Sequence, residues 1–335
     1  MKRIIAACFV LSMIALAACV KNGADKQPVI IEMPTATPAQ TSPAPEAAPA
    51  ETAQPESTPA AQPSDESVIA QTPESSKAPA LEPGGEGTIH VRGGDTLERD
   101  IIPQLVKAFS VSEREVKDAM ANADSSLIGK ASGFRRMEGI IVPGTYEIHG
   151  ESMESWLNER ISEAERRYER ISEQVPEKNE LGASERITLA SIVEGDTNLA
   201  GAFEDIAATV YLNRIKKNDK FGSCPTVEYA LGYQRPYLTS EDITVDSPYN
   251  TYKHKGLPPG PICCFDDESL KASLSKPLNG ELYFFFYDYV KREILSFANY
   301  GDFKAAGEES KALFEATFDI SRFEKMADKR EYFND

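Results

Sequence analysis

The chain has 335 residues, of which 41% are hydrophobic and 27% are charged, so it can hold one or two globular domains once any unstructured tract is subtracted. Its formal net charge is −17 at pH 7. This excess of acidic groups repels a phosphate backbone, so we expect no nucleic acid partner.

The N-terminus has the pattern of an export signal. A basic start at residues 1–3 precedes an apolar run over residues 4–18, which is shorter than the roughly 20 residues of a membrane span. The run ends in Leu-Ala-Ala-Cys at Cys19, which resembles a lipobox, so residues 1–19 are interpreted as a lipoprotein signal and Cys19 as the lipidated residue. The alternative is a plain signal peptide or short anchor with an incidental cysteine. The lipobox predicts a protein exported to the cell envelope and lipid-anchored at the extracytoplasmic face of a membrane.

Residues 20–86 are rich in Ala, Pro, Thr, Ser and Glu. Twelve of the 22 prolines of the chain lie between Pro28 and Pro83, and no Phe, Trp or Tyr occurs between Phe9 and Phe109. Such a tract cannot bury enough apolar surface to offset its chain entropy, so we expect a disordered linker. The linker would hold the folded part at a distance from the membrane.

Residues 87–150 are predicted to form a small α+β module. A short apolar run at 89–91 precedes a Gly-Gly-Asp-Thr-Leu turn at 93–97, a helical stretch over 101–120 and a β-branched run at 140–146. The Gly-Asp-Thr-Leu turn, with the Phe-Ser-Val-Ser-Glu segment that follows it, resembles a LysM carbohydrate-binding module. The alternative is a generic α+β packing module.

Apolar residues at helical spacing then predict a connecting helix within residues 151–182. This stripe consists of Trp156, Leu157, Ile161, Ala164, Tyr168 and Ile171, with Glu and Arg on the other face. Such a stripe is typical of a packing face rather than of a ligand site.

The segment 183–325 contains the residues on which the functional interpretation depends. Ser184 can cap a helix whose apolar residues extend to Val193, and Gly195 offers a stop signal. Glu194 is therefore expected at a helix C-terminus beside an apolar run. Burial and the negative end of the helix both raise the pKa of a carboxyl group, as a general acid requires. The alternative is an exposed glutamate at a helix end.

Five ordered segments strengthen this interpretation because together they resemble the YceG-like family of endolytic murein transglycosylases. They are Leu189–Glu194, Val210–Arg214, Pro225–Gly232, Asp246–Tyr252 and Gly256–Ile262. Residues 137–146 are similar to that family's Leu-Glu-Gly-Tyr-Leu-Phe-Pro-Asp-Thr-Tyr stretch, so the resemblance covers about residues 88–320.

The resemblance implies cleavage of the bond between N-acetylmuramic acid (MurNAc) and N-acetylglucosamine (GlcNAc) in nascent peptidoglycan, without water and without a cofactor. A 1,6-anhydroMurNAc end would form, which could terminate glycan elongation. One carboxyl group would act in turn as acid and base, whereas an ordinary glycosidase pairs two. The family's catalytic glutamate is placed on Glu194, and Asp196 is assigned an auxiliary role. Peptidoglycan strands and the membrane are the expected partners, and a peptidoglycan synthase is left open as a third.

Polar and aromatic residues of the family segments are candidates for sugar contacts. They are Asn213, Thr226, Tyr249, Asn250 and Tyr252. A turn or core role is the alternative for each of them. The Pro-rich turn Gly256–Pro261 cannot be regular helix or central strand, so we expect it to form a wall of the cleft.

Three cysteines depart from the family pattern close to the expected cleft. Cys224 stands before Pro225 where the family has Asp, and Cys263 and Cys264 follow Ile262. In an oxidising compartment we expect a disulfide between Cys224 and Cys263 or Cys264. The alternative is three reduced thiols packed as small hydrophobic groups. No metal site is expected, because the three His residues are scattered and no Cys-x-x-Cys spacing occurs. The family's Gly-Gly-His turn is also replaced, around residues 291–297.

We therefore predict an α+β architecture with a small LysM-like module, a connecting helix, and a catalytic domain with helices around Glu194 and a strand over 282–286. A lytic transglycosylase is the predicted function. One alternative is a non-catalytic peptidoglycan-binding lipoprotein. The other is a muramidase-type hydrolase in which Asp196 or another carboxylate activates water.

Overall fold

The computed structural model describes residues 85–199, 202–323 and 325–333, all of which belong to one compact unit. The signal segment, Cys19 and residues 20–84 of the predicted linker lie outside the described residues. Helices and two small sheets make up the described part, which is the α+β class that the sequence predicted. In this part of the chain, no helix has the length and hydropathy to cross a bilayer.

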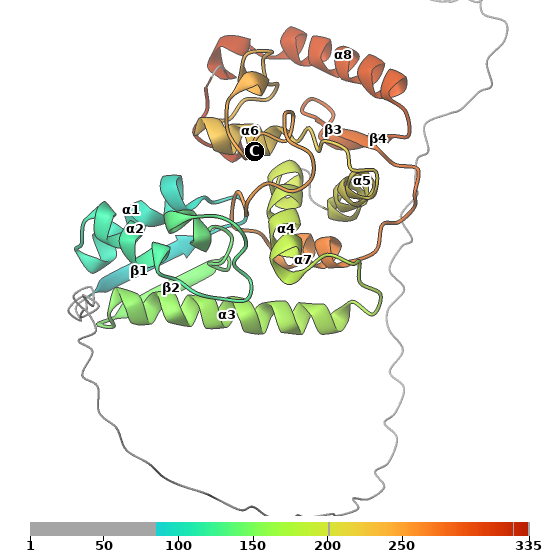
Figure 1. Cartoon of the computed structure of the whole chain (residues 1–335). Helices are drawn as coiled ribbons and strands as arrows, with labels where there is room; N and C mark the ends of the chain where they lie inside the picture. Colours follow the sequence, from blue (N-terminus) through green and yellow to red (C-terminus); the bar gives the residue numbers. More distant parts are fainter. Residues whose placement is uncertain (1–84, 200–201, 324, 334–335) are drawn as a thin grey trace, which may run out of the picture. The chain divides into compact units, whose positions relative to one another are not determined.

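The first segment, residues 85–149, contains two paired strands, and two helices lie between these strands in the chain (Figure 1). Strand β1 (Glu86–Val91) is antiparallel to β2 (Gly144–His149), with Ile89 opposite Tyr146. Between them lie a helical turn (Leu97–Ile101), α1 (Ile102–Phe109), α2 (Glu113–Ala121) and a 3-10 turn (Gly133–Met137).

The expected helix over 101–120 is two helices. Ser110 has a left-handed backbone, with φ of 54°, which ends α1. A capping box of Ser112 and Glu115 then starts α2. The β-branched run at 140–146 is only partly a strand. Residues 138–140 form a buried turn that includes Gly139, which has a φ of 70°, and the strand begins only at Gly144.

The helix predicted within residues 151–182 is α3 (Met153–Gln174), which begins after the side-chain cap of Ser152. Its apolar stripe is buried, except for Tyr168, which is partly buried. Trp156 makes edge-to-face contacts with Phe109 and Tyr146, at ring-centroid distances of 6.3 and 5.8 Å. The stripe is therefore a packing face against the first segment, as predicted.

The remaining elements follow α4 (Ala183–Thr197), which is buried over most of its length. They are α5 (Glu204–Lys216), α6 (Cys224–Leu231), a 3-10 turn (Asp242–Thr244), α7 (Asp267–Leu274), the antiparallel hairpin β3 (Phe284–Asp288) and β4 (Glu293–Phe297), α8 (Tyr300–Thr317), a 3-10 turn (Ile320–Phe323) and α9 (Arg330–Phe333).

Both predicted ends of α4 were wrong. The helix starts after Gly182, whose backbone N–H donates to Glu185 at 2.8 Å, rather than after Ser184. It continues through Gly195 to Thr197. A Cβ atom at Gly195 would lie 2.8 Å from Cβ of Pro225, so the glycine lets α4 and α6 approach closely. This packing overrides the weak helix propensity of glycine.

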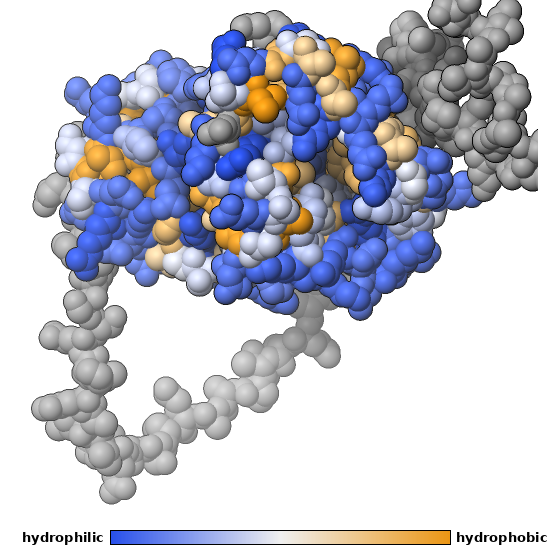
Figure 2. Space-filling view, turned by 90° about the horizontal axis from the view of Figure 1, so that it is seen from above, coloured by the Kyte–Doolittle hydropathy of each residue, from blue (hydrophilic) through white to orange (hydrophobic). Residues whose placement is uncertain are grey.

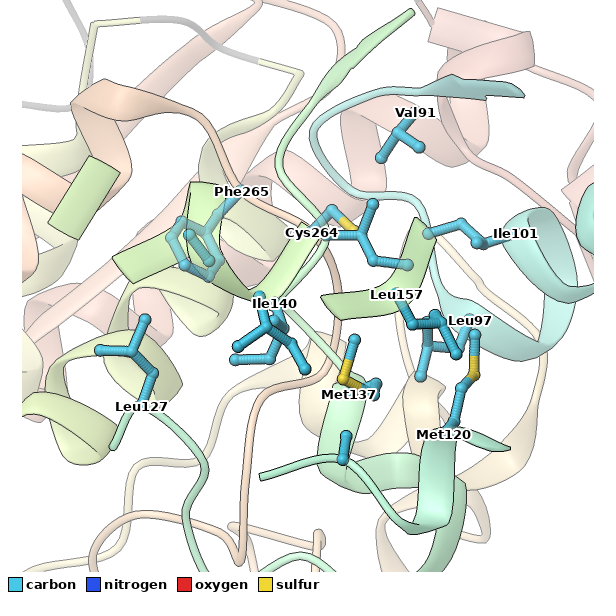
Figure 3. Packing of buried hydrophobic residues seen from close by; sticks show 14 of the residues in the cluster. Val91, Leu97, Ile101, Met120, Leu127, Met137, Ile140, Leu157, Cys264 and Phe265 are labelled. Carbon is cyan, nitrogen blue, oxygen red and sulfur yellow. The ribbon is translucent and has the colours of Figure 1, made fainter. Parts of the chain in front are cut away.

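One hydrophobic cluster joins the first segment to α3, α4 and α7. Figure 3 shows Cys264 and Phe265 among side chains of the first segment, including Leu97 and Ile140. The first segment therefore shares its core with the part of the chain that carries Glu194.

Two smaller clusters complete the core. One surrounds α4 and α5, and the other consists of Tyr289, Phe314, Phe323, Met326 and Phe333. The face seen in Figure 2 is mostly hydrophilic, with hydrophobic residues in small separate patches.

Candidate functional site

The last turn of α4 directs two carboxyl groups to different sides of the helix. Residues two apart on an α-helix are separated by about 200°, and Glu194 and Asp196 contact different elements accordingly. The two groups consequently have different neighbours and different access to the cavities beside α4.

Glu194 faces the N-terminus of α7. Its Oε2 accepts a hydrogen bond from the backbone N–H of Asp266 at 3.0 Å and another from Oγ of Ser269 at 2.8 Å. The other oxygen lies against Gly93 of the first segment, where a Cβ atom would be only 2.3 Å from Oε1. Burial is the main factor that raises the pKa of Glu194 above its ordinary value, although its two hydrogen bonds oppose this change. Glu194 therefore links α4 to α7 and to the first segment.

Asp196 faces α5 and α6. Its Oδ2 accepts hydrogen bonds from Oη of Tyr211 at 2.5 Å and from Oγ of Ser223 at 3.2 Å. Burial raises the pKa of Asp196 to about 6, although these bonds and the nearby Lys329 ammonium oppose the increase. A carboxyl group with this pKa is partly protonated near neutral pH, so it can donate a proton.

Asp196 lines a cavity of about 400 Å³, which is within the size range of small-ligand sites. Aromatic side chains form much of its wall. They are Tyr211, Phe221, Tyr237, Tyr252, Phe285, Phe286, Tyr287, Tyr289 and Phe303. Arg214, Lys311 and Lys329 add positive charge. Aromatic faces combined with a few polar groups suit a saccharide ligand.

A second cavity, of about 420 Å³, lies on the side of the first segment. Thr96, Arg99, Arg135, Tyr229 and Tyr233 contribute to its lining. Gly195, Pro225 and Lys329 line both cavities, which therefore adjoin at the last turn of α4.

The C-terminal segment contributes Lys329 to this junction. Its Nζ atom lies 3.0 Å from Oε2 of Glu228, and both side chains are buried. Met326 and Gln234 exchange two backbone hydrogen bonds of 2.8 and 2.9 Å, which hold the segment beside α6. No sequence motif marked Lys329 as a site residue.

Of the five predicted sugar contacts, only Tyr252 lines either cavity. Asn213 donates to the carbonyls of Asn279 and Leu282, and Asn250 donates to those of Ile243 and Val245. Thr226 is bonded to Ser223 and Thr251, while Tyr249 is buried against Tyr229. These four residues have the turn or core role that was the alternative.

The expected disulfide is not formed, because all three described cysteines are free. The Sγ atom of Cys224 lies 3.3 Å from Oη of Tyr252 in the wall of the Asp196 cavity. The thiol of Cys263 donates a hydrogen bond to the carbonyl of Ser191. Cys264 lies in the hydrophobic cluster that joins the first segment to α3, α4 and α7. Burial raises the pKa of the Cys224 thiol to about 11, so this thiol is mostly protonated at neutral pH.

The Pro-rich turn Gly256–Pro261 was also misassigned, since it lines neither cavity. It packs on the first segment, where Pro259 accepts a hydrogen bond of 3.0 Å from the backbone N–H of Lys130. Tyr211 and Arg214, which do line the Asp196 cavity, belong to a recognised family segment but were not selected. Their position in that segment was the signal that could have identified them.

Comparisons with known proteins agree with the resemblance in the sequence. A model of the YceG-like family matches residues 69–307. Two relatives described as endolytic murein transglycosylase, from Bacillus subtilis and Streptococcus pneumoniae, are 33% and 32% identical over 150 and 168 residues. These matches cover 44% and 48% of this chain but only 41% and 30% of the relatives. A crystal structure of a yceG-like protein from Listeria monocytogenes has a TM-score of 0.53 at 24% identity, covering 65% of this chain and 74% of that one.

Proposed function

The chain belongs to the YceG-like family, and on this premise we propose that it is a lytic transglycosylase that cleaves peptidoglycan strands endolytically. The description of its relatives as endolytic murein transglycosylases supports this activity. Because the chain matches less than half the length of each relative, the proposal also needs support from its own site. The position of Asp196 in the aromatic cavity supplies it.

We assign the acid and base roles to Asp196 rather than to Glu194, which the sequence favoured. Asp196 lines the aromatic cavity, and its Oδ1 atom accepts no hydrogen bond from the described residues. Glu194 lines neither cavity, and its Oε2 atom already accepts two hydrogen bonds. A group that protonates a glycosidic oxygen must reach within about 3 Å of it, which the position of Asp196 favours.

In the proposed reaction, protonated Asp196 donates its proton to the GlcNAc oxygen as the bond to C1 of MurNAc breaks. The resulting carboxylate then takes the proton of the MurNAc 6-hydroxyl as O6 bonds to C1. The ring closes as a 1,6-anhydro sugar, the carboxyl group is regenerated, and no water is consumed.

The charges of the cavity favour this lyase reaction over hydrolysis. Asp196 is the sole carboxylate among the described residues that line its cavity. A hydrolase of the ordinary kind needs a second carboxylate about 5 to 9.5 Å from the first, as nucleophile or as base for water. The neighbouring carboxyl group, that of Glu194, is directed to the other side of α4.

We further propose a LysM-like wall-binding role for the first segment and a lipid anchor at Cys19. The order strand, two helices, antiparallel strand supports the first proposal. The Leu-Ala-Ala-Cys sequence supports the second. An envelope enzyme anchored in this way would cut nascent strands near the membrane and end their elongation beside a peptidoglycan synthase.

Mass spectrometry of digested glycan tests the activity. Purified protein incubated with uncross-linked strands should release fragments that end in 1,6-anhydroMurNAc. Fragments with reducing MurNAc ends would indicate hydrolysis instead. Intact strands after prolonged incubation would favour the non-catalytic binding protein.

A further inference from the structure

Beside the Asp196 cavity, the end of α5 with the loop that follows it and a second loop have a surplus of positive charge. Residues 214–220 and 251–256 together contain six Lys or Arg residues and one Asp, whereas the whole chain has a formal charge of −17. Lys216 and Lys217 have a local explanation, because basic residues stabilise the C-terminal end of a helix such as α5. Three exposed lysines remain, and we call Lys220, Lys253 and Lys255 the basic rim.

The lysines of the basic rim take part in no ion pair among the described residues. The lysine ion pairs of the described residues all involve other lysines. Lys253 donates to the carbonyl of Thr244, which leaves two of its three N–H donors open. Asp219 is the one acidic residue in these loops, and its side chain accepts a hydrogen bond from the backbone N–H of Lys220.

Backbone pairing holds the basic rim next to the cavity. Lys220 and Lys255 form an antiparallel bridge, and the N–H of Gly222 donates to the carbonyl of Thr251 at 3.1 Å. Gly222, two residues after Lys220, and Tyr252, directly before Lys253, line the Asp196 cavity. Lys220 is two residues from Gly222, so their Cα atoms are at most about 7 Å apart.

The positive charge continues into the cavity wall through Arg214. Its guanidinium donates to the carbonyls of Phe221 and Tyr283 and pairs with no carboxylate of the described residues. These neutral acceptors hold the group in place without cancelling its charge. An anionic ligand that extends from the cavity would therefore meet Arg214 first and the basic rim next.

We propose that the basic rim binds the carboxylates of the peptide stem attached to the MurNAc residue in the cavity, an inference that rests on the proposed function. The stem is attached to the MurNAc residue whose glycosidic bond Asp196 would help to break, and an extended peptide advances about 3.3 Å per residue. Carboxylates on its second and third residues thus lie about 7 to 10 Å from the sugar, which is comparable to the bound of about 7 Å on the Cα separation of Lys220 and Gly222 of the cavity wall. Anionic lipid headgroups would also suit lysines, but they would not explain why the rim shares its loops with the cavity.

Binding measurements separate this inference from the activity. Fluorescent soluble glycan strands, with peptide stems or after enzymatic removal of the stems, are titrated with the full-length protein. The rim variant combines Lys220→Gln, Lys253→Gln and Lys255→Gln. A control variant combines Lys271→Gln, Lys276→Gln and Lys304→Gln, which changes the net charge equally at residues that lie outside the first segment and line neither cavity.

The wild type and the control should bind stem-bearing strands about tenfold more tightly than stripped strands at low salt, and added salt should reduce this preference. The rim variant should lose the preference and bind stripped strands normally. Stem preference without release of anhydro products would refute the proposed function and leave this inference standing. Equal affinity of the wild type for both strands, or a rim variant that retains the preference, would overturn the inference. A rim variant that keeps the preference but loses salt-sensitive binding to phosphatidylglycerol vesicles would assign the lysines to the membrane instead.

Discussion

Glu194 and Asp196 are two residues apart on α4, yet their carboxyl groups bind side chains on opposite sides of the helix. Ser269 of α7 donates to Glu194 at 2.8 Å, and Tyr211 of α5 donates to Asp196 at 2.5 Å. One carboxyl group therefore belongs to the packing between α4 and α7, while the other borders the aromatic cavity. This arrangement separates a positioning residue from the proposed acid and base.

Substitution of each carboxyl group by its amide should distinguish these roles. We expect Asp196→Asn to lower the rate of anhydroMurNAc release by about 10²- to 10⁴-fold, because the amide can neither donate the acid proton nor accept the hydroxyl proton. Glu194→Gln should cost less than tenfold, since its amide oxygen can still accept from Asp266 and Ser269. Rates are compared after circular dichroism has shown that both variants are folded. The opposite order of losses would restore Glu194 as the catalyst.

The pH dependence of kcat/KM offers a second test of the assignment. The acid form of Asp196 is required in the free enzyme, and its pKa is about 6. The logarithm of kcat/KM should therefore fall by about one unit per pH unit above pH 6. Glu194→Gln should keep this descending limb at the same pH, because it leaves Asp196 in place. Disappearance of the limb in Glu194→Gln would contradict the assignment.

The elements predicted correctly from sequence are those with a local signal. The stripe on α3 repeats at helical spacing over several turns and predicted a buried face. The ends of α4 depend on tertiary packing, since Gly195 continues the helix against Pro225 instead of ending it. No local pattern in the sequence contains that contact.

The same distinction applies to the candidate site. The family segments located α4 and its two carboxylates, but the sequence could not show which carboxylate faces the cavity. Asn213 and Asn250 were selected because amides suit sugars. In the structure, however, their side-chain N–H groups donate to backbone carbonyls of the protein. Lys329 comes from a segment beyond residues 69–307, which the family model matches, so no motif pointed to it.

The lipid anchor can be tested by Cys19→Ala. If Cys19 is acylated after cleavage of the signal, the wild type should fractionate with membranes and metabolic labelling with a fatty acid should mark it. The variant should lose the label and the membrane association. Normal processing and unchanged fractionation of Cys19→Ala would refute the lipobox interpretation.

Glu138 should make folding stability depend on pH. It is buried and accepts hydrogen bonds from the N–H of Leu97 at 3.0 Å and from Oη of Tyr229 at 2.9 Å. Burial raises the pKa of Glu138 to about 7, whereas an unfolded glutamate titrates near 4.3. The folded state therefore holds the proton at higher pH, so Glu138 should destabilise the protein progressively as pH rises from about 4 to 7, by about 3 kcal/mol in all. Urea unfolding of wild type and Glu138→Gln at pH 4.5 and 7.5 measures how much free energy of unfolding is lost between these pH values. If both proteins lose the same amount, Glu138 is not the source of the pH dependence.

Two glycines in helices should respond to alanine in opposite directions. At Gly195 the new Cβ atom would lie 2.8 Å from Cβ and 3.2 Å from Cγ of Pro225, so α6 would have to move away from α4. Overpacking of this kind costs about 1 to 3 kcal/mol, which outweighs the roughly 1 kcal/mol gained from better helix propensity. Gly307 of α8 has no atom within 4 Å of the corresponding position, so Gly307→Ala should stabilise the protein by up to about 1 kcal/mol. Urea unfolding midpoints at one pH give both values.

Because Gly195 also lies between the two cavities, Gly195→Ala should lower activity at temperatures where it remains folded. A stabilised and fully active Gly195→Ala would show that the close approach of α4 and α6 is not required.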